Sequence, residues 1–97
     1  MWIGWIEFDL LLGDVHSLKG KRSVLRPLSA EVRRRFEVSV AEVDLQELHR
    51  RTVLGACLVA ADRAHVVAVL DAVERHVAAR PGVELLSARR REVTSDD

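Results

Sequence analysis

Hydrophobic and polar side chains alternate between residues 2 and 12 of this chain. One side of the segment carries an unbroken apolar set, Trp2, Gly4, Ile6, Phe8, Leu10 and Leu12. The opposite side carries a mixed set, Ile3, Trp5, Glu7, Asp9 and Leu11. Because successive side chains of a strand point to opposite faces, this period of two predicts a β-strand whose apolar side faces the core.

A helical period follows the turn residues Gly13 and Asp14. Ser17 is a typical N-cap and predicts a helix that runs to about Phe36. At about 100° per residue, the apolar side chains of this helix fall within an arc of about 120°. They are Leu18, Val24, Leu25, Leu28, Val32 and Phe36. Pro27 lacks a backbone donor but points toward solvent, so we expect a bend in the helix there rather than a break.

Two further strands precede the next helix. Period two returns over residues 37–44 and predicts a strand, which a polar connection then links to residue 52. Residues 52–61 form an almost unbroken apolar run around Gly55. Such a run is typical of a central strand that is covered on both faces, or on one face with a partner on the other.

The last two elements are a helix and a strand. Asp62 caps a helix with apolar residues at intervals of three and four, and Pro81 and Gly82 end it. Residues 83–93 then form the last strand, and we expect a disordered tail over residues 94–97.

The predicted order is strand, helix, strand, strand, helix, strand, within one domain over residues 1–93. This is the split β-α-β arrangement of ferredoxin-like domains, an α+β fold. We expect a four-stranded antiparallel sheet with both helices on one face and the 2–12 and 52–61 strands in the middle.

Composition narrows the functional classes. The 97 residues are 48% hydrophobic and 31% charged, which is ordinary for a single globular domain. Fifteen basic and fifteen acidic residues give a net charge of zero, so bulk attraction to nucleic acid or to an anionic membrane is excluded. The single cysteine cannot form an internal disulfide, and no apolar run reaches the roughly 18 residues of a membrane span. We therefore expect a cytoplasmic protein with no membrane partner.

Charge is nevertheless segregated along the chain. Residues 16–35 hold seven basic side chains and one acid, whereas residues 37–47 hold four acids and no base. Four of the cations fall within about 60° of one another on the first helix, beside its apolar stripe. They are Lys19, Arg22, Arg26 and Arg33. A basic stripe of this kind is the expected footprint of phosphate-backbone contact.

The full set of nucleic-acid-binding candidates is Lys19, Lys21, Arg22, Arg26, Arg33, Arg89 and Arg91. The alternative for the helix is a solvated face, which thirteen arginines make common in this chain. The sheet itself is not expected to stack RNA bases, as RNA-recognition domains of this fold do with aromatic residues on their central strands. The 52–61 strand has no aromatic residue, and the 2–12 strand offers only Trp5 on its open face. RNA contact would therefore use phosphates and shape.

The open face of the sheet is a second candidate surface. Ile3 and Trp5 would stand there beside one of two rows of the 52–61 strand. The rows are Leu54, Ala56 and Leu58 or Val53, Cys57 and Val59. Either row leaves an apolar patch exposed, and such patches mark partner surfaces. Ile3 and Trp5 are thus interface candidates, and a homodimer would cover them.

The loop over residues 13–22 brings free helix amides and three cations together, which suits an anion. It resembles the phosphate loop of acylphosphatases, which share the fold. That family orients its attacking water with an asparagine, and this chain has none, so acylphosphatase activity is not expected. Gly13 and Gly20 are better explained as residues that turn the chain.

No catalytic, metal or cofactor site is predicted. The four histidines, His16, His49, His65 and His76, lack metal-ligand spacing. Cys57 lies within an apolar strand, where a cysteine is usually a small core residue. Glu7 and Asp9 share a strand face, but nothing in the pattern places them in a pocket.

Three segments resemble the YlxP-like family, a bacterial domain of unknown function. They are residues 16–22 (HSLKGKR), 38–48 (VSVAEVDLQEL) and 53–55 (VLG), in the order and at the spacing of the family. The likeness covers nearly the whole chain, and Pro27 within the first helix is its one departure. The resemblance implies a ferredoxin-like fold and a gene neighbourhood of ribosome-maturation and translation-initiation factors, hence a role near the ribosome. It supplies no activity, catalytic residue or cofactor.

From these observations we expect a non-enzymatic accessory protein that contacts RNA or a ribonucleoprotein, such as the ribosome, through the basic helix flank. The alternative is an oligomeric scaffold or regulatory interaction domain that uses the open sheet face. No small-molecule ligand is indicated, and an anion bound in the 13–22 loop would instead favour an enzyme.

Overall fold

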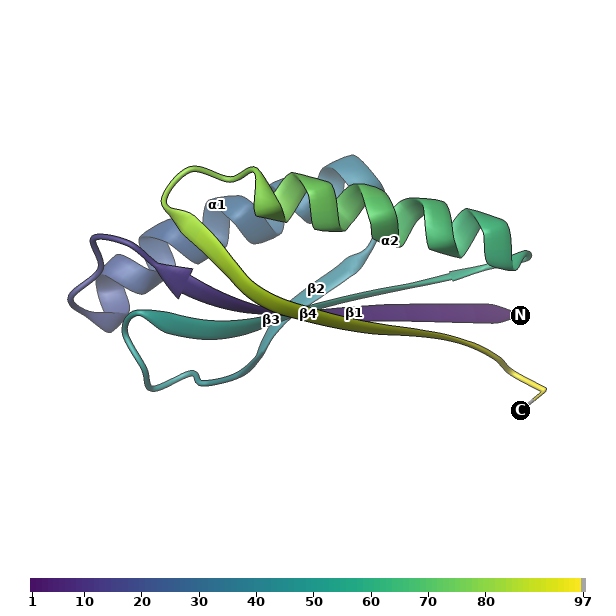
Figure 1. Cartoon of the computed structure of the whole chain (residues 1–97), viewed down its shortest axis with the longest axis horizontal. Coiled ribbons are helices and arrows are strands. Elements are labelled where there is room, and N and C mark those ends of the chain that lie inside the picture. Colours follow the sequence, from purple (N-terminus) through teal and green to yellow (C-terminus); the bar gives the residue numbers. More distant parts are fainter. Residues whose placement is uncertain (97) are drawn as a thin grey trace.

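The computed structural model describes residues 1–96 and contains six elements in the order βαββαβ (Figure 1). In chain order they are β1 (Trp2–Leu12), α1 (Leu18–Phe36), β2 (Ser39–Asp44), β3 (Arg51–Ala60), α2 (Arg63–Ala78) and β4 (Val83–Thr94). Every element predicted from the hydrophobic pattern is present, and the observed ends lie within about two residues of the expected ones.

The four strands form one antiparallel sheet in the order β2-β3-β1-β4. The central strands are therefore β1 and β3, and both helices lie on the same side of the sheet (Figure 1). This is the ferredoxin-like α+β architecture that the element order predicts. The opposite side, called the open face below, is covered by neither helix.

The alternation along β1 produces the core. Its inward positions from Gly4 to Leu12 are buried between the sheet and the helices. Gly4 permits a close approach of α2, because a Cβ atom at this position would lie 2.2 Å from Cγ1 of the fully buried Val66. The inward row of β3 is Leu54, Ala56 and Leu58, so the row on the open face contains Val53, Cys57 and Val59. This decides between the two rows that the sequence left open.

Helix α1 packs on the sheet along the predicted stripe, with one exception at its start. Leu25, Leu28 and Val32 are buried, as the helical period requires. Leu18 is 40% exposed, contrary to expectation, because it lies in the first turn of α1, at the end of the stripe. Pro27 is exposed and the helix continues through it, so there is no break.

The caps of both helices are confirmed. The Ser17 side chain accepts a hydrogen bond from the amide of Gly20 at 3.0 Å, and the Asp62 carboxylate accepts one from the amide of His65 at 2.8 Å. These bonds satisfy amides that the first turn of a helix leaves without a partner.

The end of β4 differs from the expected disordered tail. The strand extends through Thr94, and the amide of Ser95 donates a hydrogen bond to the carbonyl oxygen of Met1 at 2.9 Å. Met1 and Ser95 are thereby joined at one end of the sheet. Of the residues predicted as a tail, Asp97 lies outside the described part of the chain.

Candidate functional site

Four exposed cations lie along one flank of α1. We call Lys19, Arg22, Arg26 and Arg33 the basic flank. Lys19, Arg22 and Arg26 border one shallow surface hollow, and Arg22, Arg26 and Arg33 border the next one along the helix. The flank extends over about 21 Å, because each helical residue rises by about 1.5 Å. The structure thus brings together the four cations that the helical period predicts to be neighbours.

The positive charges of the basic flank are not paired with carboxylates in the described residues, although Glu42, which pairs with Lys21, borders the same hollow as Arg22, Arg26 and Arg33. Arg33 donates to the carbonyl oxygen of Val40 at 2.7 Å, and Arg22 has only a long bond of 3.4 Å to the carbonyl oxygen of Leu18. Within residues 1–96, no carboxylate forms an ion pair with any member of the flank. Their field therefore extends into solvent.

Five other arginines are paired with carboxylates, in contrast to the basic flank. The pairs are Arg51–Asp9, Arg63–Glu92, Arg80–Glu31, Arg89–Glu7 and Arg90–Asp71. In the last pair, the hydrogen bond to Asp71 of α2 raises the pKa of the Arg90 guanidinium. On the sheet and α2, these pairs leave Arg91 and Arg75 as the arginines without an ion pair in the described residues.

Arg89 and Arg91 do not extend the basic flank. Their register partners on β1 are Glu7 and Trp5, so both arginines stand on the open face, on the side of the sheet away from α1. Arg89 lies 2.6 Å from a carboxylate oxygen of Glu7 and packs over the Trp5 ring at 5.8 Å from its centroid. The predicted seven-residue nucleic-acid surface is therefore divided between two faces of the molecule.

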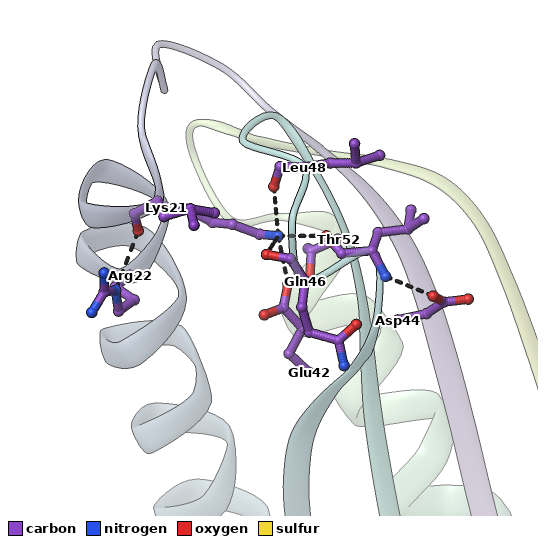
Figure 2. Close-up of polar contacts among 9 residues, drawn as sticks. Lys21, Arg22, Glu42, Asp44, Gln46, Leu48 and Thr52 are labelled. Carbon is purple, nitrogen blue, oxygen red and sulfur yellow. Dashed lines mark hydrogen bonds and ion pairs between the residues drawn. The ribbon is translucent and has the colours of Figure 1, made fainter.

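Lys21 is a correction to the predicted site, because its side chain is inside the protein. The residue is 2% exposed, and its Nζ reaches across to the β2–β3 loop. There it donates to the carbonyl oxygens of Leu45 at 2.8 Å and Leu48 at 2.7 Å, and it lies 2.7 Å from Glu42 Oε2 (Figure 2). A lysine held in this way cannot contact a nucleic acid.

The helical period contains the signal that could have found this role. At about 100° per residue, Lys21 lies between the directions of Leu25 and Leu28, in the middle of the buried stripe. A charged residue on a core-facing position needs partners of its own, and these are supplied by the loop between β2 and β3. The structural partner that the sequence analysis did not identify is therefore Glu42, the carboxylate opposite Lys21.

Lys21 and Glu42 shape the β2–β3 loop next to the start of α1. Glu42 Oε2 also accepts a hydrogen bond from the Thr52 hydroxyl at 2.6 Å, which ties β2 to β3. Leu45 adopts a left-handed conformation with φ of 59°, and its amide donates to the Asp44 carboxylate at 2.7 Å (Figure 2). The loop conformation thus depends on a charge that is supplied by α1.

The 13–22 loop offers less to an anion than the sequence suggests. Of its three cations, Lys21 is buried, which leaves Lys19 and Arg22 on the surface. The amide of Gly20 donates to Ser17, and the amide of Gly13 donates to the carbonyl oxygen of Gly82 at 3.0 Å. These amides are therefore already satisfied within the fold.

The open face carries an apolar patch, as expected for Ile3 and Trp5. Cys57 is the register partner of Trp5, and Val59 is that of Ile3. Beside them lies an open hollow of about 270 Å³ that is lined by Trp5, Cys57 and the backbone at Gly55, among other residues. The patch and the basic flank are on opposite sides of the sheet.

Neither a metal site nor a membrane helix is found in the described residues. No group of three or more histidine, cysteine, aspartate or glutamate side chains in residues 1–96 is arranged to hold a metal ion. Neither α1 nor α2 is long and apolar enough to cross a membrane.

Comparison with known proteins places the chain in a family. The sequence model of the family DUF503, described as a protein of unknown function, matches residues 3–90. The uncharacterized protein YlxP of Bacillus subtilis (strain 168) is 32% identical over 82 residues, which cover 84% of this chain and 89% of that protein. Among solved structures, SnoaB, a cofactor-independent oxygenase from Streptomyces nogalater, superposes with a TM-score of 0.51 at 12% identity, over 99% of this chain and 94% of that one. This last likeness shows a shared fold alone. The family match and the sequence identity confirm the YlxP-like resemblance, and the chain belongs to the DUF503 family of proteins of unknown function.

Proposed function

We propose that this protein is a non-enzymatic accessory protein that contacts RNA, free or within a ribonucleoprotein such as the ribosome, through the basic flank of α1. The observation that carries the proposal is the absence, within residues 1–96, of any carboxylate paired with Lys19, Arg22, Arg26 or Arg33. A protein of zero net charge that leaves four cations in one row has a local field suited to a polyanion.

The spacing of the flank supports a backbone-following mode of contact. Successive intervals of three, four and seven residues separate the Cα atoms by about 4.5, 6 and 10.5 Å along the helix axis. The ammonium of Lys19 and the three arginine guanidinium groups at these intervals can donate to successive phosphate oxygens. The row thus favours contact with a phosphodiester backbone rather than with a single small anion.

The composition of the sheet favours binding without base readout. Trp5 is the one aromatic residue among the outward positions of β1 and β3, and Arg89 already packs over its ring. Stacking of several bases on the sheet, as in RNA-recognition domains, therefore has no platform in these two strands. We expect affinity that depends on salt and on phosphate geometry and varies little with base sequence.

The test compares two double charge reversals in a gel-shift or filter-binding assay with ribosomal RNA and with a plain RNA duplex. Arg22→Glu/Arg26→Glu reverses two members of the flank. Arg34→Glu/Arg75→Glu makes the same change of net charge at two exposed helical arginines outside it. We expect the flank variant to lose most RNA retention and the control variant to retain it. Equal losses in both variants, or no RNA binding by the wild type, would refute the proposal.

A second experiment addresses the cellular partner. The wild type and the flank variant are used as bait in lysate, with and without nuclease treatment. Ribosomal RNA and proteins should accompany the wild type only, and nuclease should release them if the contact is made through RNA. Recovery of the same ribosomal proteins by the flank variant would contradict the assignment of contact to α1.

A further inference from the structure

The strand β3 is apolar on both of its faces, although the helices cover only one. Its inward row packs in the core, and its outward row between residues 53 and 59 is Val53, Gly55, Cys57 and Val59, without a polar side chain other than the thiol. An antiparallel sheet with one solvated face normally alternates apolar and polar residues. Val59 is 61% exposed in the single chain, which is unusual for the side chain of a central strand. The sequence of β3 is thus that of a strand whose second face is also covered.

Charges on this part of the open face are balanced within the face itself. Glu7 pairs with Arg89, and Arg51 forms a two-pronged bond to Asp9 with distances of 2.7 and 2.8 Å. These pairs flank the apolar patch on the side of Glu7. Two identical copies of such a face therefore have little net charge to repel each other. A polyanion would have to displace Glu7 and Asp9 from the arginines with which they pair. Arg91 adds one further cation, on the edge strand β4, where it would remain at the rim of an interface.

The shape of the face also suits contact with an identical face. It carries a projecting side chain, Val59, and a hollow of about 270 Å³ beside Gly55, where a Cβ atom would lie 3.0 Å from Val43 Cγ1. An interface around a two-fold axis is self-complementary, so a projection on one copy can enter a recess on the same surface of the other. The hollow is mainly apolar in its lining, which matches a valine side chain.

The size of the face is sufficient for a stable dimer. Four strands at about 4.8 Å spacing and about ten residues of β1 and β3 at 3.3 Å give a projected area of about 600 Å². Standard-size interfaces bury about 600–1,000 Å² per partner, so the area of the whole face lies at the lower end of that range. A second copy can therefore cover the patch in full.

From these observations we propose that the open face is a homodimer interface, with the sheets of two copies packed face to face around Trp5, Cys57 and Val59. The basic flanks of the two copies then lie on the outer sides of the dimer, because the helices are on the opposite side of each sheet. This inference does not depend on RNA binding, and a dimer would present two basic flanks to a partner.

The decisive variant is Val59→Asp. Because this side chain is largely exposed in the single chain, the carboxylate can be hydrated in a monomer, and the fold should be retained. In the dimer the carboxylate would be buried against an apolar face, which we expect to weaken association by roughly a hundredfold. Leu48→Asp is the matched control, because Leu48 is a comparably exposed leucine, 48% exposed, in the β2–β3 loop.

The measurements are solution mass and thiol reactivity. In sedimentation equilibrium, the wild type and Leu48→Asp should reach twice the 10.9 kDa mass of the chain, and Val59→Asp should remain near that mass. Cys57 is the single cysteine, so maleimide labelling reports on the interface directly. It should be slow in the wild type at dimer concentrations and fast in Val59→Asp, with circular dichroism checking that both are folded.

The possible results are separable from those of the RNA assays. A wild type that stays at monomer mass at high concentration overturns the inference, and so does a folded Val59→Asp variant that still dimerises with protected Cys57. The Arg22→Glu/Arg26→Glu variant should dimerise normally. If this variant loses RNA binding but still dimerises, the dimer inference is supported. If the wild type binds RNA but is a monomer, the dimer inference is refuted and the proposed RNA contact is not affected.

Discussion

The ammonium group of Lys21 lies 2.7 Å from a carboxylate oxygen of Glu42, and the lysine side chain retains only 3% of its exposure. The pair connects α1 to the end of β2, and the same ammonium donates to the carbonyl oxygens of Leu45 and Leu48. All three of its N–H bonds are thereby used. The two lysines of α1 therefore have different roles, although they are only two residues apart. Lys19 is on the surface, whereas Lys21 is buried and stabilises the fold.

Replacement of Lys21 by methionine should destabilise the protein by about 3 kcal/mol. The substitution keeps most of the volume but removes the donor to the Leu45 and Leu48 carbonyl oxygens and the charge opposite Glu42, which keeps the hydrogen bond from Thr52. Loss of a hydrogen-bonded charged partner is costly. The free energy of unfolding from urea titration measures the loss. Lys19→Met is the control and should change stability by less than about 0.5 kcal/mol, because its side chain is exposed and forms no ion pair within residues 1–96. A difference within error between the two variants would contradict the structural role of Lys21.

The element order and the sheet were predictable because two local periods are almost uninterrupted in this chain. The alternation in β1 and the apolar run in β3 mark them as central strands, and the Ser17 and Asp62 caps mark where the helices begin. These are local properties that short-range sterics and hydrogen bonding decide. The pattern could not decide which row of β3 faces the core, because both rows are apolar.

The candidate site was predictable only in part. The directions of Lys19, Arg22 and Arg26 follow from helix geometry alone, and the structure agrees with them. The pairing of Arg89 with Glu7 depends on the register between β4 and β1, which no local pattern specifies. To predict the burial of Lys21, one needs its direction on the helix and also the position of the β2–β3 loop, which comes from another part of the chain.

Substitution of Gly4 by alanine should destabilise the protein by about 1–3 kcal/mol, because the added methyl group overpacks the contact between β1 and α2. Its Cβ would lie 2.2 Å from Val66 Cγ1 and 3.2 Å from Leu70 Cδ1, and both of these side chains are fully buried. Gly13→Ala is the matched control, since its nearest neighbour would be the carbonyl oxygen of Gly82 at 3.6 Å. That variant should be neutral or slightly stabilised. Equal denaturation midpoints for the two variants would argue against this packing of α2.

The salt dependence of RNA binding should report how many flank cations contact phosphate. The slope of log K against log salt concentration is negative, and neutralising two of them in Arg22→Gln/Arg26→Gln should make it less steep by about 1.4 for single-stranded RNA. The reason is that each lost phosphate contact removes one released counterion. Titrations of the wild type, this variant and Arg34→Gln/Arg75→Gln at several salt concentrations measure the slope. An unchanged slope with weakened affinity would mean that the two arginines act on the fold rather than on phosphate.

Replacement of Pro27 by alanine should stabilise the protein by about 2 kcal/mol. Proline within a helix removes the N–H that would donate to the carbonyl oxygen of Ser23 and crowds that turn, while its exposed ring contributes little packing. Alanine restores the hydrogen bond. It also raises the conformational entropy of the unfolded chain, which offsets part of the increase in stability. Pro81→Ala, at the other proline, is the control. It is exposed and lies outside the helices, so only the unfolded-state effect remains and stability should fall by about 0.4–1 kcal/mol. Urea midpoints that move in the same direction for both variants would show that Pro27 does not destabilise α1.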